Sequence, residues 1–178
     1  ASALRKVAWL MRAMAGGLTF ASAKLTEISA PDVRGAIDRA GPFDAYVLNG
    51  AQMAGAYQNI FGDKPRLFVA HNVEHQSAKE NAEAAHGAFQ KFLFRREAHL
   101  LHELETRLCR EARFVYTLAE EDRTALNVGS DDCSVALPLV TTDREPAQPA
   151  KRDIECDAAL IGTWSWQPNR IGLDWFLE

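Results

Sequence analysis

The segment RLFVAHNVEH (residues 66–75) decides the fold class of this chain. Its first half, residues 66–70, is apolar on both faces, which predicts a strand in the middle of a parallel sheet. Its second half, HNVEH (71–75), therefore begins where that strand ends. The same five letters also fit H-x-x-E-H, in which two histidines on one helical face bind Zn²⁺. Two interpretations follow: a zinc peptidase, or a strand end that lines a ligand cleft.

Strands and helices alternate through the rest of the chain. Short runs rich in aromatic and β-branched residues predict further strands over 43–48, 113–118, 133–140 and 157–166. Apolar periodicity and capping residues predict helices over 3–14, 29–42, 51–61, 78–112, 119–126 and 168–178. This alternation predicts an α/β protein with a Rossmann-like parallel sheet flanked by helices.

A polar stretch with two prolines, residues 141–156, reads as a linker between two domains. Residues 1–140 are expected to form the first domain, and residues 157–178 the first strand and helix of a second one. The chain does not begin with Met and stops inside an amphipathic pattern, as expected of a fragment.

Composition narrows the classes of function. The 178 residues are 47% hydrophobic, and a formal net charge of −4 argues against a nucleic-acid-binding protein. Cys109, Cys133 and Cys156 form no C-x-x-C and read as buried thiols of a reducing compartment, which predicts a cytoplasmic protein. No apolar run is long enough to predict a membrane span.

Polar residues stand directly after the strand at 66–70. In open α/β sheets ligands bind outside the carboxyl ends of the strands, where His71, Asn72 and Glu74 would lie. The plain alternative is that His71 only hydrogen-bonds loop backbone. A histidine at a strand end does not share a helical face with His75, and no third metal ligand has a familiar spacing, so no metal is expected here.

Two further groups have ordinary explanations. His99, His102, Glu97 and Glu105 are expected on the solvated face of the long helix. The helix over 3–14 is expected to pack against the protein through an apolar stripe formed by Leu4, Val7, Ala8, Met11 and Met14. The alternative for this helix is peripheral contact with a membrane surface, because Arg5, Lys6 and Arg12 accompany the stripe.

The order of the segments is more specific than any one of them. VAHNVE (69–74), RREAHLLHELETRLCREA (95–112), RFVYTLAEEDRTAL (113–126), VALPLV (135–140) and IGTWSWQPNRIGLDWF (161–176) occur in this order. In that order they resemble the family 4-type glycosyltransferases, in particular the sugar transferases of bacterial exopolysaccharide and cell-surface glycan synthesis. The resemblance covers roughly residues 42–178.

The resemblance implies a GT-B fold, with two Rossmann-like domains that hold the acceptor and the nucleotide sugar. It implies transfer from a nucleotide-diphosphate sugar to a glycan or lipid-linked acceptor with retention, without an obligatory cofactor or metal. The place of such an enzyme would be the cytoplasm or the inner face of the cell membrane. The first β-α unit and the donor-binding glutamate pair of the family lie outside these residues, so the fragment alone is expected to be inactive.

The resemblance also assigns residues. His71 matches a histidine close to the transferred sugar, with Glu74 as its polar neighbour. Gly162, Thr163 and Asn169 fall in the segment that faces the nucleotide phosphates. Ala119 departs from the serine usual in the family, and the Asn-Gly pair expected after the fourth strand is missing. A non-catalytic Rossmann-like binding module remains the second alternative.

Overall fold

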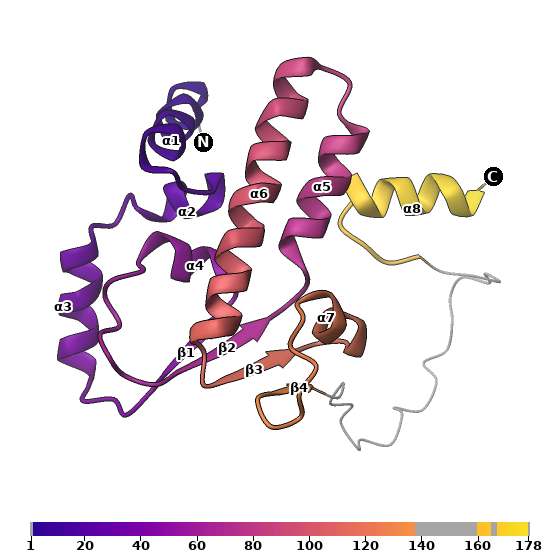
Figure 1. The fold of residues 1–178 in the computed structure, drawn as a ribbon. Helices are drawn as coiled ribbons and strands as arrows, with labels where there is room; N and C mark the ends of the chain where they lie inside the picture. Colours follow the sequence, from indigo (N-terminus) through magenta and orange to yellow (C-terminus); the bar gives the residue numbers. More distant parts are fainter. Residues whose placement is uncertain (1, 138–159, 165–166, 178) are drawn as a thin grey trace, which may run out of the picture. The chain divides into compact units, whose positions relative to one another are not determined.

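The computed structural model describes residues 2–137, 160–164 and 167–177 (Figure 1). The chain divides into two compact units, Ala1–Leu139 and Val140–Glu178. The sheet and helices α1–α7 belong to the first unit, and α8 (Gln167–Leu177) belongs to the second. None of the helices in the described residues is long and apolar enough to cross a membrane.

Four parallel strands form the sheet of the first unit. They are β1 (Tyr46–Asn49), β2 (Arg66–Ala70), β3 (Phe114–Thr117) and β4 (Ser134–Ala136). Their order is β1-β2-β3-β4, so the prediction of a central strand over 66–70 in a parallel sheet is confirmed. The register pairs Asn49 with Val69 and Ala70 with Thr117, so the carboxyl ends of these strands meet at one edge.

Helices cover one face of this sheet. Strands that follow one another in the chain are neighbours in the sheet, and the order always steps in the same direction. Right-handed crossover connections between such strands place their helices on the same face of the sheet. The core between the strands and α6 (Ala88–Glu111) includes Leu48, Phe68, Ala70, Val115, Leu104 and Leu108. On the opposite face Val47 is 61% exposed, and Leu67 and Val69 are half-buried. The expectation that residues 66–70 are buried on both faces of the sheet is therefore wrong in the described residues.

The long helix predicted over 78–112 is two helices. α5 (Glu74–Ala84) and α6 pack against each other as a hairpin that buries Ala78 and Ala82 of α5. The backbone is extended at Ala85 and at Gly87, and glycine is a poor helix former. The chain turns back there because the pairing buries an apolar face on each helix, which a single straight helix would leave in water.

Three helices precede the sheet, and a fourth follows β1. They are α1 (Ala3–Gly16), α2 (Phe20–Leu25), α3 (Ala30–Ala40) and α4 (Ala51–Ala56). The side chain of Ser29 accepts a hydrogen bond from the Asp32 N–H and caps α3, as the capping residues in the sequence predict. α4 approaches α2 and α6 through Gly55, where a Cβ atom would lie 2.6 Å from Ser22 Oγ.

The packing of α1 differs from the prediction. The buried residues of this helix are Trp9 and Ala13, which lie about half a turn away from the predicted stripe. Trp9 Nε1 donates a hydrogen bond of 2.6 Å to Glu27 Oε1. The apolar stripe expected to pack against the protein is exposed at Leu4, Val7, Met11 and Met14.

The end of the chain is described only in part. α7 (Glu120–Ala125) precedes β4, and the linker over 141–156 lies outside the described residues. Of the strand predicted over 157–166, residues 160–164 are described and do not form a strand. The helix predicted from Pro168 is present as α8.

Candidate functional site

His71 lies directly after β2, at the carboxyl edge of the sheet. Its Nε2 atom is 2.5 Å from Asn49 Oδ1, at the end of the neighbouring strand β1. Parallel pairing sets these two strand ends side by side, and both side chains are exposed. Because the Asn49 oxygen can only accept, Nε2 carries a hydrogen and the free ring atom is Nδ1. Nδ1 accepts a hydrogen bond from a ligand in the neutral ring and donates one in the protonated ring.

Glu74 is the first residue of α5 and stands on the same edge. Gln52 of α4 donates its side-chain N–H to Glu74 Oε2, while Thr19 donates to Gln52 Oε1 over 2.6 Å. Ser22 donates to the Gln52 carbonyl oxygen over 2.8 Å. Burial raises the pKa of Glu74 and the Gln52 hydrogen bond opposes that shift, while repulsion from Glu105 adds to it. The edge thus carries a positioned carboxyl group beside an accessible imidazole.

Glu105 of α6 determines where α5 begins. Its side chain accepts the Glu74 N–H over 2.7 Å and the His75 N–H over 3.2 Å. The residue before the helix is Val73, which provides no side-chain cap. The carboxylate of a second helix therefore satisfies two of the free amides at this helix start and complements its dipole.

The same carboxylate holds His75. His75 Nδ1 lies 2.6 Å from Glu105 Oε2, and the ring of His102 meets the His75 ring edge-on with centroids 4.7 Å apart. Glu105 is buried and His75 is mostly buried. The prediction that Glu105 lies on a solvated face is therefore wrong. His75 lies outside the helix predicted over 78–112, but in the structure it is a helix residue bound to a core carboxylate. His99 is exposed, as predicted.

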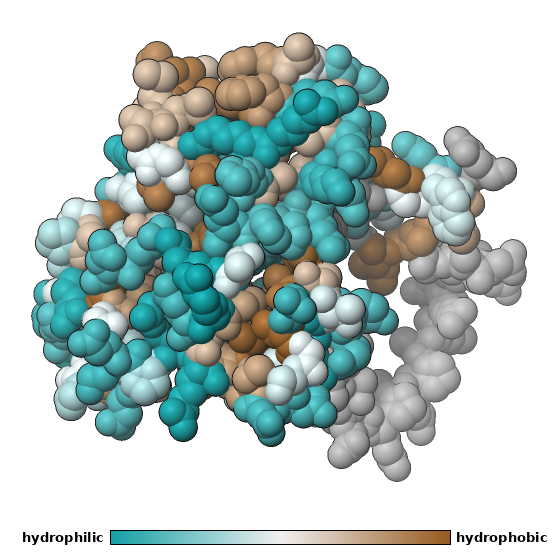
Figure 2. Space-filling model, in the orientation of Figure 1, coloured by the Kyte–Doolittle hydropathy of each residue, from teal (hydrophilic) through white to brown (hydrophobic). Residues whose placement is uncertain are grey.

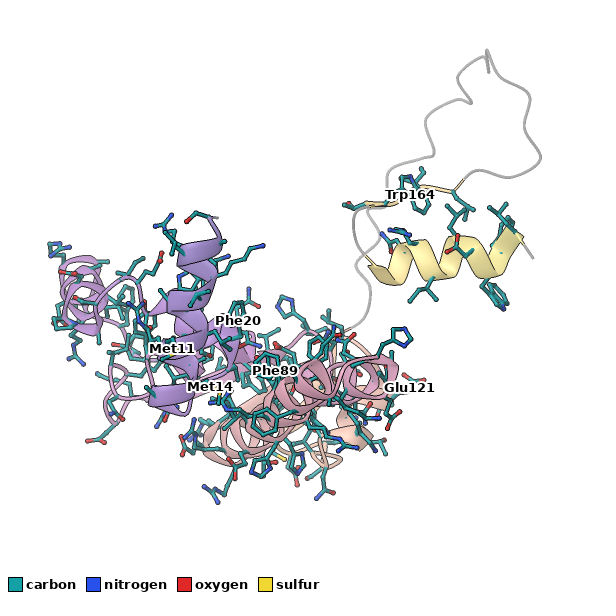
Figure 3. All side chains as sticks on the ribbon, turned by 90° about the horizontal axis from the view of Figure 1, so that it is seen from above. Met11, Met14, Phe20, Phe89, Glu121 and Trp164 are labelled. Atoms are coloured by element: carbon teal, nitrogen blue, oxygen red, sulfur yellow. The ribbon has the colours of Figure 1, made fainter. Side chains whose placement is uncertain are left out.

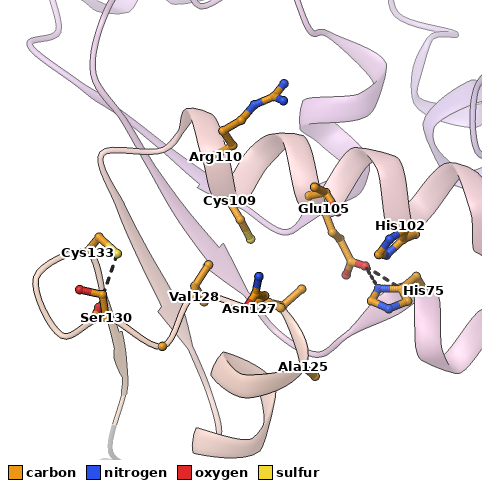
Figure 4. Close-up of a pocket in the computed structure, with 13 residues that line it drawn as sticks. His75, His102, Glu105, Cys109, Arg110, Ala125, Asn127, Val128, Ser130 and Cys133 are labelled. Atoms are coloured by element: carbon orange, nitrogen blue, oxygen red, sulfur yellow. Dashed lines mark hydrogen bonds and ion pairs between the residues drawn. The ribbon is translucent and has the colours of Figure 1, made fainter.

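A pocket of about 560 Å³ opens beside this group, between α6 and the segment that follows α7 (Figure 4). Figure 4 shows His75, His102 and Glu105 at one end, and Cys133 with Ser130 at the other. Burial, with repulsion from Glu105, raises the pKa of the Cys109 thiol in its wall to about 11. The thiol is therefore protonated at neutral pH and a poor nucleophile. Cys109 is half-buried and Cys133 is exposed, so the prediction of buried thiols is wrong for Cys133.

The two histidines of HNVEH do not share a helical face. His71 lies three residues before α5, whereas His75 is inside it, and each is bound to a different partner. The described residues contain no group of three or more His, Cys, Asp or Glu side chains placed to hold a metal ion. The arrangement required by the zinc-peptidase interpretation is absent at 71–75.

The second unit contains the predicted phosphate-facing residues. Asn169, in the first turn of α8, donates to the Thr163 carbonyl oxygen over 3.3 Å. A Cβ atom at position 162 would lie 3.0 Å from Asn169 Nδ2, so Gly162 permits this approach. Gly162, Thr163 and Asn169 thus form one local turn ahead of the helix, and their role toward a phosphate stays a prediction.

Comparisons with protein families, with curated proteins and with solved structures find no match for this chain. Two contributions to the site were missed from the sequence. Asn49 lies one residue past the strand predicted over 43–48, although a polar residue at the end of a neighbouring strand could have been placed beside His71. Glu105 lies one turn from both Leu101 and Leu108, so the helical period could have placed it on the buried side.

Proposed function

We propose that the protein is part of a GT-B-type glycosyltransferase, and that the carboxyl edge of β1 and β2 contacts the transferred sugar. The observation that supports this most directly is the pairing of His71 with Asn49 on an exposed edge, next to the carboxyl group of Glu74. Sugars present several hydroxyl groups, which donate and accept hydrogen bonds, and this edge offers an imidazole, an amide and a carboxyl group. The order of sequence segments that resembles the family is the second support.

In this proposal the residues of the edge position the transferred sugar. In the proposed transfer the bond between the sugar and the nucleoside diphosphate breaks, and an acceptor hydroxyl forms the new bond and loses its proton. Asn49 holds the His71 ring with Nδ1 free toward a sugar hydroxyl. A contact that becomes stronger as charge develops lowers the barrier, whereas uniform binding does not. Glu74 accepts from a second hydroxyl.

The donor side of the proposal concerns the second unit. The backbone of Gly162 and Thr163, followed by the start of an eleven-residue helix, suits a diphosphate, because amide groups at a helix start favour anions. Gly162→Ala would bring a methyl group close to Asn169 and disturb this turn. In this proposal no metal or cofactor is needed beyond the nucleotide sugar.

The test uses the complete natural polypeptide and a panel of UDP- and GDP-sugars, with release of the nucleoside diphosphate as the readout. His71→Ala should lower kcat about 10²-fold, the lower range for loss of one such electrostatic contact. His99→Ala, an exposed histidine on α6, is the matched control and should keep the normal rate. A normal rate for His71→Ala would make this histidine structural, and failure of every donor to bind in calorimetry would reject the proposed function.

A further inference from the structure

The N-terminal end of the first unit carries an apolar surface that the described residues of this unit leave exposed. On α1, Leu4 is 83% exposed, Val7 58% and Met11 65%. At the start of α6, Phe89 is 69% exposed and Phe92 is also exposed. Figure 2 shows apolar side chains gathered over this end of the molecule. Figure 3 looks down on it and shows Met11 and Met14 on α1, with Phe20 and Phe89 on the neighbouring helices.

A groove connects these helices into one surface. It has a volume of about 460 Å³, and it runs between α1, α2 and α6. Its wall is mostly apolar and includes Val7, Leu10, Phe20, Leu93 and Phe94. Arg96 joins α6 to the end of α1, because its guanidinium donates to the carbonyl oxygens of Ala13 and Leu18 over 2.7 and 3.1 Å. These hydrogen bonds hold α1, which carries the exposed stripe, against α6.

Positive charge surrounds this surface although the whole chain is acidic. α1 contains Arg5, Lys6 and Arg12 and no acidic residue, and Lys91 lies between Phe89 and Phe92 in α6. Arg5 pairs with Glu27, whereas no ion pair among the described residues involves Lys6, Arg12 or Lys91.

Two acidic groups near the groove are engaged by the protein. Both oxygens of Glu97 accept the Phe20 N–H over 2.8 and 3.1 Å. Glu27 accepts from Trp9 and Arg5. The charge that α1 leaves to meet a partner is therefore positive, next to its methionine side chains.

We infer that α1 and the start of α6 dock onto an anionic lipid bilayer. An apolar stripe flanked by cations lies in the membrane interface with its apolar side chains among the acyl chains and its cations at the anionic head groups. Charge complementarity selects this partner over a second copy of the chain, which would bring the same cations to the interface. The docking does not depend on sugar transfer, so it can fail or succeed independently of the proposed function.

The experiment measures sedimentation of the protein with vesicles of pure phosphatidylcholine and of equal parts phosphatidylcholine and phosphatidylglycerol. Binding to the mixed vesicles is expected, with weaker binding to the neutral ones and at high salt. Val7→Gln and Met11→Gln should each weaken binding about tenfold. Lys6→Gln should weaken it about fivefold. Val47→Gln is the matched control, since this valine is 61% exposed on the sheet, away from the groove. The Val47→Gln variant should bind the vesicles as the unchanged protein does.

Three results would overturn the inference. They are the absence of binding to mixed vesicles, equal binding to both vesicle types, and an equal loss for Val7→Gln and Val47→Gln. Self-association in sedimentation velocity that Val7→Gln abolishes, without vesicle binding, would assign the surface to a second copy instead. All these positions are exposed, so unfolding by urea should confirm that each variant is as stable as the unchanged protein.

Discussion

His71 and His75 are four residues apart in the chain, and their surroundings differ in burial, partner and charge. His71 is exposed at a strand end and meets an amide oxygen. His75 is mostly buried inside a helix and meets a core carboxylate. The boundary between them is the start of α5 at Glu74. A short sequence motif therefore does not fix the role of its residues. The start of a helix lies inside this one, so the two histidine rings have different surroundings.

The largest effect is expected at Glu105. Glu105→Ala removes three hydrogen bonds and leaves the buried start of α5 without its acceptor, which should lower the free energy of unfolding by about 3 kcal/mol. Urea unfolding measures this. Glu103→Ala, on the exposed side of the same helix, should change it by less than about 0.5 kcal/mol. A loss below about 1 kcal/mol for Glu105→Ala would show that α5 does not need this cap.

A smaller effect should separate the two histidines directly. His75→Ala loses a hydrogen bond to a buried charged group and should lower the free energy of unfolding by about 2 kcal/mol. His71→Ala loses one exposed contact and should lower it by less than about 0.5 kcal/mol. Thermal and urea unfolding of both variants make the comparison. Equal losses would mean that the strand-end histidine is as structural as the helical one.

The smallest effect concerns the residue at the boundary. Burial raises the pKa of Glu74 above its ordinary value of 4.5, so the folded chain keeps this proton to higher pH than the unfolded chain does. The stability that Glu74 contributes is therefore complete below pH 4.5 and is lost as the pH rises through the folded-state pKa. Unfolding of Glu74→Gln should show less loss over that range than the unchanged protein. Parallel stability curves for the two proteins would contradict the raised pKa.

Much of the sheet could be predicted, because short β-branched and aromatic runs between turn residues mark parallel strands in the sequence itself. Residues 66–70 lie in the middle of the sheet as expected, and β1 and β3 lie within a few residues of their predicted bounds. α2 was missed because its residues, FASAKL, show no apolar repeat that continues past one turn. The break between α5 and α6 was missed because periodicity continues across it, and only tertiary packing chooses between one helix and a hairpin.

The site was less predictable than the sheet. The strand-end position of His71 follows from the local pattern, but its pairing with Asn49 depends on strand order, which a single sequence does not give. The pairing of His75 with Glu105 joins residues 30 positions apart and requires the hairpin. The face of α1 that packs was wrongly chosen because the helix is apolar on two sides, and the pattern alone does not say which side meets the protein.

The capping of α5 by Glu105 has a consequence for how the folded chain opens. The amides of Glu74 and His75 reach their hydrogen-bond acceptor only after α6 has docked, so the start of α5 belongs to the same cooperative unit as the core helix. These two amides should then exchange their hydrogens with solvent only when the hairpin opens as a whole. The loop that carries His71 is anchored at one end by β2 and at the other by the hydrogen bonds to Glu105. The proposed sugar-contacting edge therefore depends on the docking of α6 as well as on β2.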